Sequence, residues 1–339
     1  MEPIMTAGEK LERNEAIDML RGLSMFVMVL LHTNAYFLSN SFVYFVWNYS
    51  QFAVPVFIFC SSYLFFVKKY PLNKRKEIVV HIKKRLSRLL APYYLFAIVY
   101  IFLQYTKEPS KVSFQYLFQN LTITEGISIN WLVLLFVFFI FLMPLILYLW
   151  NHKRIFFSVY VFFSVTSSVI FMFLQPPFNY RFIMWLPWSL IIIFSFFLAK
   201  NDHKDRLFFS FFLLWLTIFA VTYFIERGVG HSLRMFDNKY PPNLYHLSYG
   251  LASIPALYFL AKKRLFSFPI LRQLFHFLSI NSYPFYFLHW IVLYVVTVFF
   301  RIRFNWVSFF LTVLLTTTIV QMILNRSFHW IKNYRFSTL

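Results

Sequence analysis

Long apolar runs separated by short polar or basic stretches fill most of this chain. A run of about 20 apolar residues is long enough to cross a bilayer as a helix. The pattern predicts an all-α polytopic membrane protein of about ten transmembrane helices, with both termini on the cytoplasmic side. The predicted spans are 19–38, 42–67, 89–105, 131–150, 155–174, 183–199, 207–225, 244–261, a span that starts near 283, and 307–325.

The composition supports the membrane assignment. Of the 339 residues, 60% are hydrophobic and only 13% are charged, whereas soluble proteins average about 25% charged residues. Forty-nine Phe and six Gly favour lipid-facing helices over a β-barrel, which needs alternating strands and many turns. No polar stretch is long enough for a second domain. We therefore expect one membrane domain over 1–339, with a cytoplasmic leader (1–18) and a basic interfacial segment (68–88).

The net charge of +20 agrees with this topology. If the N-terminus is cytoplasmic, 24 of the 32 Lys and Arg residues fall on the inner side, as the positive-inside rule requires. The charge therefore needs no nucleic-acid partner, and it favours contact with anionic lipid headgroups. The sequence predicts a multi-pass protein of a bacterial cell (plasma) membrane. The outer stretch 227–243, which includes Lys239, is expected to be a solvated loop, with contact to an acceptor as the alternative.

The first predicted span carries unusual ionisable residues: Asp18 and Arg21 open it, and His32 follows eleven residues after the arginine. At a rise of about 1.5 Å per residue, His32 lies roughly 16 Å from Arg21, near the middle of a bilayer. Ionisable groups at that depth are costly and are candidates for function. The alternative is that His32 only bonds a neighbouring helix.

A second cationic feature precedes the third span. Arg85 and Arg88 are spaced i, i+3, so they lie on one face of a helix. An arginine pair can bind phosphate or carboxylate in a bidentate manner. Attraction to lipid headgroups explains the other cations of 68–88 equally well.

Two further groups of candidates lie downstream. Trp131 opens the fourth span, where it can be a membrane-interface tryptophan or a stacking surface for a sugar. Ser282, Tyr286 and His289 follow one another at helical spacing, and Pro284 predicts a helix break near Tyr283. Each can be structural or can belong to a site.

Together these motifs resemble the type-3 acyltransferase family of membrane enzymes, which acylate cell-surface glycans and related acceptors. The residues that match the family pattern are Asp18, Arg21, His32, Arg85, Arg88, the Trp131-Leu132 pair, Ser282, Tyr286 and His289. The resemblance implies transfer of a short acyl group, such as acetyl, from cytosolic acyl-coenzyme A to a hydroxyl of a glycan or lipid-linked acceptor. It implies a catalytic role for His32 with Asp18 and Arg21, donor binding by Arg85 and Arg88, and acceptor contacts by Trp131, Ser282, Tyr286 and His289.

The sequence does not contain the residue patterns that several other kinds of chemistry require. The chain has no phosphate-binding Gly-rich loop and no His or Asp cluster with metal-ligand spacing, and its single cysteine, Cys60, excludes an internal disulfide. His32 can act as a general base for direct transfer or can carry the acyl group covalently. An exporter or flippase for a lipid-linked glycan and a non-catalytic partner of a glycan synthase remain rival functions. The acyl group, the acceptor and the oligomeric state stay open.

Overall fold

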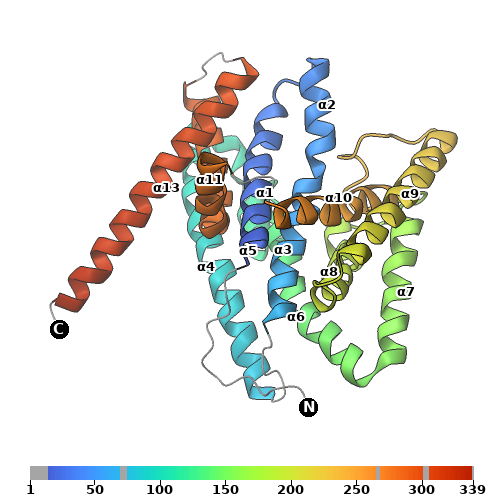
Figure 1. Ribbon diagram of the computed structural model, residues 1–339. Helices are drawn as coiled ribbons and strands as arrows, with labels where there is room; N and C mark the ends of the chain where they lie inside the picture. Colours follow the sequence, from blue (N-terminus) through green and yellow to red (C-terminus); the bar gives the residue numbers. More distant parts are fainter. Residues whose placement is uncertain (1–13, 69–74, 265–267, 301–304, 338–339) are drawn as a thin grey trace.

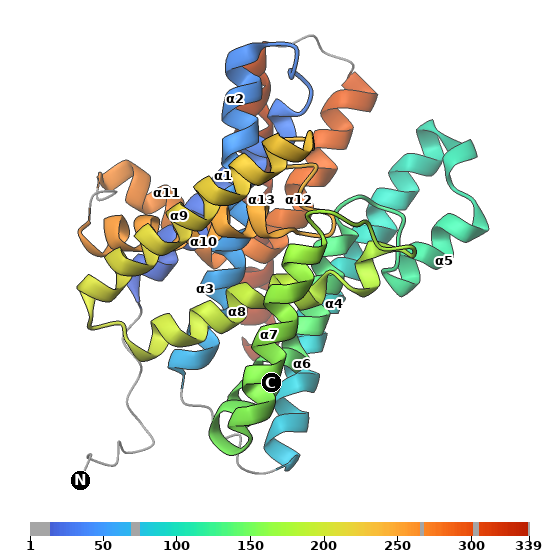
Figure 2. The same ribbon diagram turned by 90° about the vertical axis from the view of Figure 1, so that its right-hand side faces the viewer.

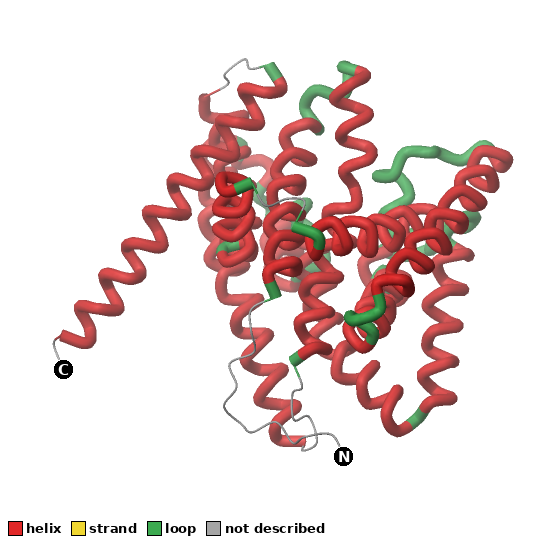
Figure 3. Tube along the Cα trace, in the orientation of Figure 1, coloured by secondary structure: helices red, strands yellow, loops and turns green. Residues whose placement is uncertain are grey.

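The computed structural model describes residues 14–68, 75–264, 268–300 and 305–337. This part of the chain is helical throughout, without strands (Figure 3). The α-helices are α1 (Glu15–Asn34), α2 (Ser41–Tyr49), α3 (Ala53–Val67), α4 (Arg75–Lys107), α5 (Phe114–Thr122), α6 (Asn130–His152), α7 (Arg154–Ile170), α8 (Trp185–Lys200), α9 (Asp205–Val229), α10 (Leu244–Lys262), α11 (Pro269–Ile280), α12 (Ser282–Tyr294) and α13 (Trp306–Ser337). Short 3-10 helices lie at η1 (Ser50–Phe52), η2 (Pro109–Lys111) and η3 (Tyr180–Phe182), and α12 continues as a π-helix, η4 (Val295–Phe300).

Eight helical stretches in this part of the chain are long and apolar enough to cross a membrane. The all-α, polytopic membrane fold expected from the hydrophobic pattern is thus confirmed. The two other predicted spans also form helices, but α7 has only 17 residues and α10 is not among the eight. Figure 1 shows α10 lying across α1 and α3, nearly perpendicular to them.

Helix α1 occupies the centre of the bundle, and α3, α10, α11, α12 and α13 all pack against it (Figures 1 and 2). Its first turn begins earlier than expected because the Asn14 side chain accepts a hydrogen bond from the Ile17 amide and caps the helix. Residues 15–18 therefore belong to α1, and Asp18 is buried instead of lying in a polar leader. Residues 1–13 of the expected leader lie outside the described residues.

Two of the predicted segments show more detail in the structure. The span predicted at 42–67 is confirmed as one candidate span, Ser41–Val67, in which the short helix η1 joins α2 to α3 just before Pro55. Residues 75–88, expected to form an amphipathic helix that leads into the third span, are continuous with that span in the 33-residue helix α4. Residues 69–74 of that basic segment lie outside the described residues.

The C-terminal part also differs. The final helix does not end at residue 325, because α13 continues to Ser337 and slopes away from the bundle (Figure 1). The break near Pro284 is confirmed, but it lies at Asn281, between α11 and α12. Tyr283 is helical, against expectation, because Pro284 lies in the first turn of α12, where the missing N–H costs no hydrogen bond.

The contact between α1 and α11 depends on Gly22. A Cβ atom at this position would lie 2.0 Å from the carbonyl oxygen of Phe275, so only glycine lets the two backbones approach this closely. An ion pair between Arg272 Nε and Glu15 Oε1 (2.6 Å) joins the same helices at their N-terminal ends. This contact places α11, which the sequence analysis did not predict, beside the arginine of α1.

Candidate active site

At the N-terminal end of α1, Asp18, Arg21 and Ser279 form a closed triangle of hydrogen bonds. Arg21 Nη2 donates to Asp18 Oδ1 (2.9 Å), and Ser279 Oγ donates to the same oxygen (2.8 Å). Arg21 Nε in turn donates to Ser279 Oγ (3.0 Å). Asp18 and Arg21 were both selected from the sequence, whereas Ser279 was missed because it lies on α11. The triangle fixes one side of the guanidinium and leaves the rest free to face a cavity.

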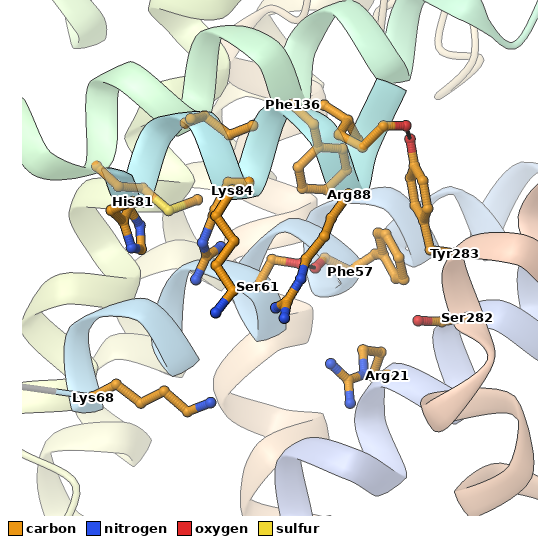
Figure 4. Close-up of a pocket in the computed structure, with 14 residues that line it drawn as sticks. Arg21, Phe57, Ser61, Lys68, His81, Lys84, Arg88, Phe136, Ser282 and Tyr283 are labelled. Atoms are coloured by element: carbon orange, nitrogen blue, oxygen red, sulfur yellow. Dashed lines mark hydrogen bonds between the residues drawn. The ribbon is translucent and has the colours of Figure 1, made fainter. Parts of the chain in front are cut away.

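That cavity, called here the basic cavity, has a volume of about 460 Å³. Its basic lining residues are Arg21 from α1, Lys68 at the end of α3, and His81, Lys84, Arg85 and Arg88 from α4. Figure 4 shows the side chains of Arg21, Lys84 and Arg88 reaching it from opposite sides. The long helix α4 carries its four basic residues over two turns, which concentrates positive charge in one place. A cavity lined by three arginines and two lysines suits a ligand with several phosphate groups.

Arg85, Arg88 and Ser282, three of the residues selected from the sequence, line this same cavity. Arg85 also packs over the ring of Phe65, at 5.6 Å from the ring centroid. Ser282 therefore lies with the arginines and apart from His289, although the sequence analysis grouped it with that histidine. Tyr283, which also lines the cavity, donates a hydrogen bond to the carbonyl of Leu89 (2.6 Å) and so ties α12 to α4.

At the other end of α1, His32 and His289 are joined by a hydrogen bond of 2.8 Å between His32 Nδ1 and His289 Nε2. The two rings lie almost parallel. His289 is fully buried (0% exposed), while His32 keeps part of its surface open. The Trp290 ring packs edge-on against His32 at 4.8 Å.

The hydrogen bonds define the tautomers of this histidine pair. His289 Nδ1 lies 3.1 Å from the carbonyl oxygen of Phe285, and a carbonyl can only accept, so Nδ1 carries the proton. In the neutral ring His289 Nε2 is then an acceptor, and His32 Nδ1 must donate to it. The remaining nitrogen, His32 Nε2, therefore holds a free lone pair, which is the state that a general base or a nucleophile requires.

Tyr286 and Trp131 lie next to the histidine pair. The Tyr286 ring packs against His289 at 5.7 Å, and its hydroxyl donates to the carbonyl of Ile129 (3.3 Å), two residues before Trp131. Trp131 is only 6% exposed. Its ring stacks on Trp188 at 6.1 Å and meets the edge of Tyr240 at 5.0 Å. Trp131 thus belongs to a packed aromatic cluster.

The connection between α9 and α10 supplies a residue that the sequence analysis missed. This stretch was expected to be solvated, but Lys239 is only 5% exposed and reaches into the aromatic cluster. Its Nζ donates to Gln51 Oε1 (3.3 Å) and lies 5.0 Å from the centroid of the Trp131 ring. Burial lowers the pKa of Lys239 to about 7. No sequence signal distinguishes this lysine from its exposed neighbours, because its burial depends on how the connection folds.

The described residues contain no group of three or more His, Cys, Asp or Glu side chains placed to hold a metal ion. Two sets of polar residues therefore carry the available chemistry: the basic cavity and the histidine pair. A family model described as an acyltransferase domain matches residues 14–326 of the chain. The chain belongs to the type-3 acyltransferase family. No match was found among curated proteins or among solved structures.

Membership in the family makes the protein a membrane acyltransferase. The matched range includes both sets of site residues, from Asp18 to His289. It ends within α13, whose last turns extend past it.

Proposed function

We propose that this acyltransferase moves a short acyl group from acyl-coenzyme A to a hydroxyl of a cell-surface glycan or a related, lipid-linked acceptor. The observation that carries the proposal is the location of the histidine pair and the basic cavity at the two ends of one helix, α1. A donor whose phosphates bind at one end can extend its thioester towards the other.

In this proposal the basic cavity binds the phosphates of coenzyme A. Arg85, Arg88 and Arg21 provide forked donors, and Lys84 and Lys68 add positive charge. Asp18 and Ser279 hold Arg21 in position from the side away from the ligand. With the N-terminus in the cytoplasm of a bacterial cell, the cavity would open to the side that contains acyl-coenzyme A.

His32 is the proposed general base. His289 accepts the Nδ1 proton of His32, which leaves the Nε2 lone pair for the acceptor hydroxyl. The hydroxyl oxygen then attacks the thioester carbon, and the coenzyme A thiolate leaves with the proton that His32 has taken. Tyr286 positions His289 through their ring contact, and Trp131 and Ser282 border the path of the substrates.

Two measurements test this function. In membranes with matched expression, transfer from labelled acetyl-coenzyme A should fall by about 10²–10⁴-fold in the His32→Ala protein, the range that general acid–base catalysis contributes. Detection of an acyl group bound covalently to His32 would support the covalent mechanism instead of direct transfer. Transfer that is equal in both proteins would contradict the role of His32, and wild-type membranes without transfer would favour an exporter or a synthase partner.

The donor site is tested separately with Arg88→Ala. Loss of one arginine–phosphate contact should raise the KM for acyl-coenzyme A by about tenfold or more, because a hydrogen bond between charged groups contributes about 1.5–3 kcal/mol. Arg154→Ala is the matched control, since Arg154 lies over the ring of Trp150 and outside the basic cavity. An equal KM in the two variants would contradict the proposal that the basic cavity binds the phosphates of coenzyme A.

A further inference from the structure

Lys239 stands out among the buried groups that the proposed function does not use. It comes from the connection that joins α9 to α10, and it contacts Gln51 of η1 and Trp131 of α6. Its ammonium group lies 5.0 Å from the ring centroid of Trp131 and 5.4 Å from that of Tyr240. Aromatic faces attract cations, so these rings hold the ammonium in place without neutralising it.

The buried ammonium has unused hydrogen-bonding capacity. It carries three N–H donors, and within the described residues it makes one hydrogen bond, to the neutral amide oxygen of Gln51. No carboxylate in this part of the chain forms an ion pair with it. Burying a cation without an anionic partner is costly, so the position is better explained by a ligand that brings an electron-rich oxygen.

A chain of contacts through Trp131 and Tyr286 links Lys239 to the histidine pair. The charge of Lys239 interacts electrostatically with His32. Trp131, whose ring lies under the ammonium, is the second residue of α6. It comes two residues after Ile129, whose carbonyl accepts a hydrogen bond from the Tyr286 hydroxyl. Tyr286 packs on His289. One continuous cluster therefore extends from Lys239 to His32.

The connection that carries Lys239 is held in place by its own hydrogen bonds. The Met235 amide donates to Asn48 Oδ1 (2.8 Å), and the Met235 carbonyl accepts from His246 Nδ1 (2.9 Å). At the end of the connection, Asn243 Nδ2 donates to Glu226 Oε1 (2.8 Å). A donor that is fixed before the substrate arrives needs no reorganisation during the reaction, which is the condition for strong electrostatic stabilisation.

We propose that Lys239 is a further catalytic residue, whose ammonium group donates a hydrogen bond to the carbonyl oxygen of the acyl group during transfer. The inference rests on the proposed function. The acceptor oxygen bonds to the carbonyl carbon while its proton passes to His32 Nε2, and the carbonyl electron pair moves onto the oxygen that Lys239 contacts. When the carbonyl reforms, the carbon–sulfur bond breaks, and the coenzyme A thiolate takes the proton from His32.

The test compares Lys239→Met and Lys239→Arg with wild type in the labelled acetyl-coenzyme A assay. Methionine fills the same space without a donor, so kcat should fall by about 10²–10³-fold, as when one oxyanion donor is removed. The KM for acyl-coenzyme A should stay within about twofold, because the basic cavity is untouched. Lys111→Met, which removes an exposed lysine paired with Glu108, should behave like wild type.

A pH profile separates catalysis from structural support. In wild type, kcat should decline as pH rises and Lys239 loses its proton, whereas the Lys239→Arg protein keeps its charge and should keep its activity to higher pH. The charged and titratable groups around Lys239 are Tyr240, whose ring lies 5.4 Å from the ammonium, and His32 and His246, which interact with its charge. All three are present in every variant. This profile decides the question even if Lys239→Met fails to accumulate.

The possible outcomes separate the proposed role of Lys239 from the proposed acyl-transfer function. A Lys239→Met protein with wild-type kcat, or identical pH profiles for wild type and Lys239→Arg, would overturn the role of Lys239 and leave the acyltransferase function standing. A wild-type protein that transfers no acyl group would overturn both. Coenzyme A binding, measured by thermal shift on the purified variants, verifies that the folded donor site remains.

Discussion

At the scale of single residues, the hydrogen bond between His32 and His289 is the most informative contact, because it selects which nitrogen of His32 is free. We expect His289→Leu to reduce kcat for acyl transfer, since His32 would lose the acceptor that fixes its tautomer and ring orientation. His289→Gln should retain more activity, because its amide oxygen can accept the same proton. The loss should stay below the roughly 10²–10⁴-fold contributed by the base itself.

The comparison is made by steady-state kinetics on the two variants, with coenzyme A binding as the control for folding. Equal losses in His289→Leu and His289→Gln would show that the size of the imidazole matters and its hydrogen bond does not. A loss as large as that of His32→Ala would instead place His289 in direct contact with the substrate.

The sequence indicated which residues belong to the candidate site, but it did not indicate which of them contact one another. His32 and His289 could be selected because histidines inside apolar helices are costly. Their pairing could not be predicted, because 257 positions separate them and only the packing of α12 on α1 joins them. Lys239 was missed for the related reason that a lysine in a polar connection looks solvated until the connection is folded.

At the scale of helices, the contact of α1 with α11 positions Arg21, and Gly22 makes that contact possible. We predict that Gly22→Ala destabilises the protein, since its Cβ would overlap the carbonyl of Phe275. Overpacking of this kind costs about 1–3 kcal/mol. As α11 moves, Ser279 should shift away from Arg21, so the KM for acyl-coenzyme A should rise as well.

Gly228→Ala is the matched control, because no atom lies within 4 Å of the added Cβ and alanine favours the helix. Thermal unfolding in detergent and the KM for acyl-coenzyme A are the measurements. If Gly22→Ala unfolds at the same temperature as Gly228→Ala, the close approach of α1 and α11 is not needed for stability.

The helices themselves were partly predictable. Strongly apolar segments such as α6 and α8 were found within a few residues, because a run of about 20 apolar residues has few alternatives in a membrane. In contrast, α11 has only 12 residues with one apolar face, and a short amphipathic pattern gives no hydropathy peak. The direction of α10 across the bundle follows from packing alone.

At the scale of the whole molecule, the burial of Lys239 connects stability to pH. Burial lowers the pKa of Lys239 from the usual 10.5 to about 7. At a pH between these two pKa values, Lys239 therefore carries a proton in the unfolded chain that it lacks in the folded protein. Stability should therefore rise with pH in this window, by up to about 1.4 kcal/mol per pH unit for one proton. Below pH 7 both states are charged, and the cost of burying the cation is constant.

We predict that the unfolding temperature of wild type in detergent increases from pH 7 to pH 9 relative to that of Lys239→Met, which has no titrating group at this position. At pH 6 the methionine variant should be the more stable protein, because it buries no charge. Parallel curves for the two proteins would mean that Lys239 is not buried as a cation, and its place beside Trp131 and Gln51 would then need another explanation.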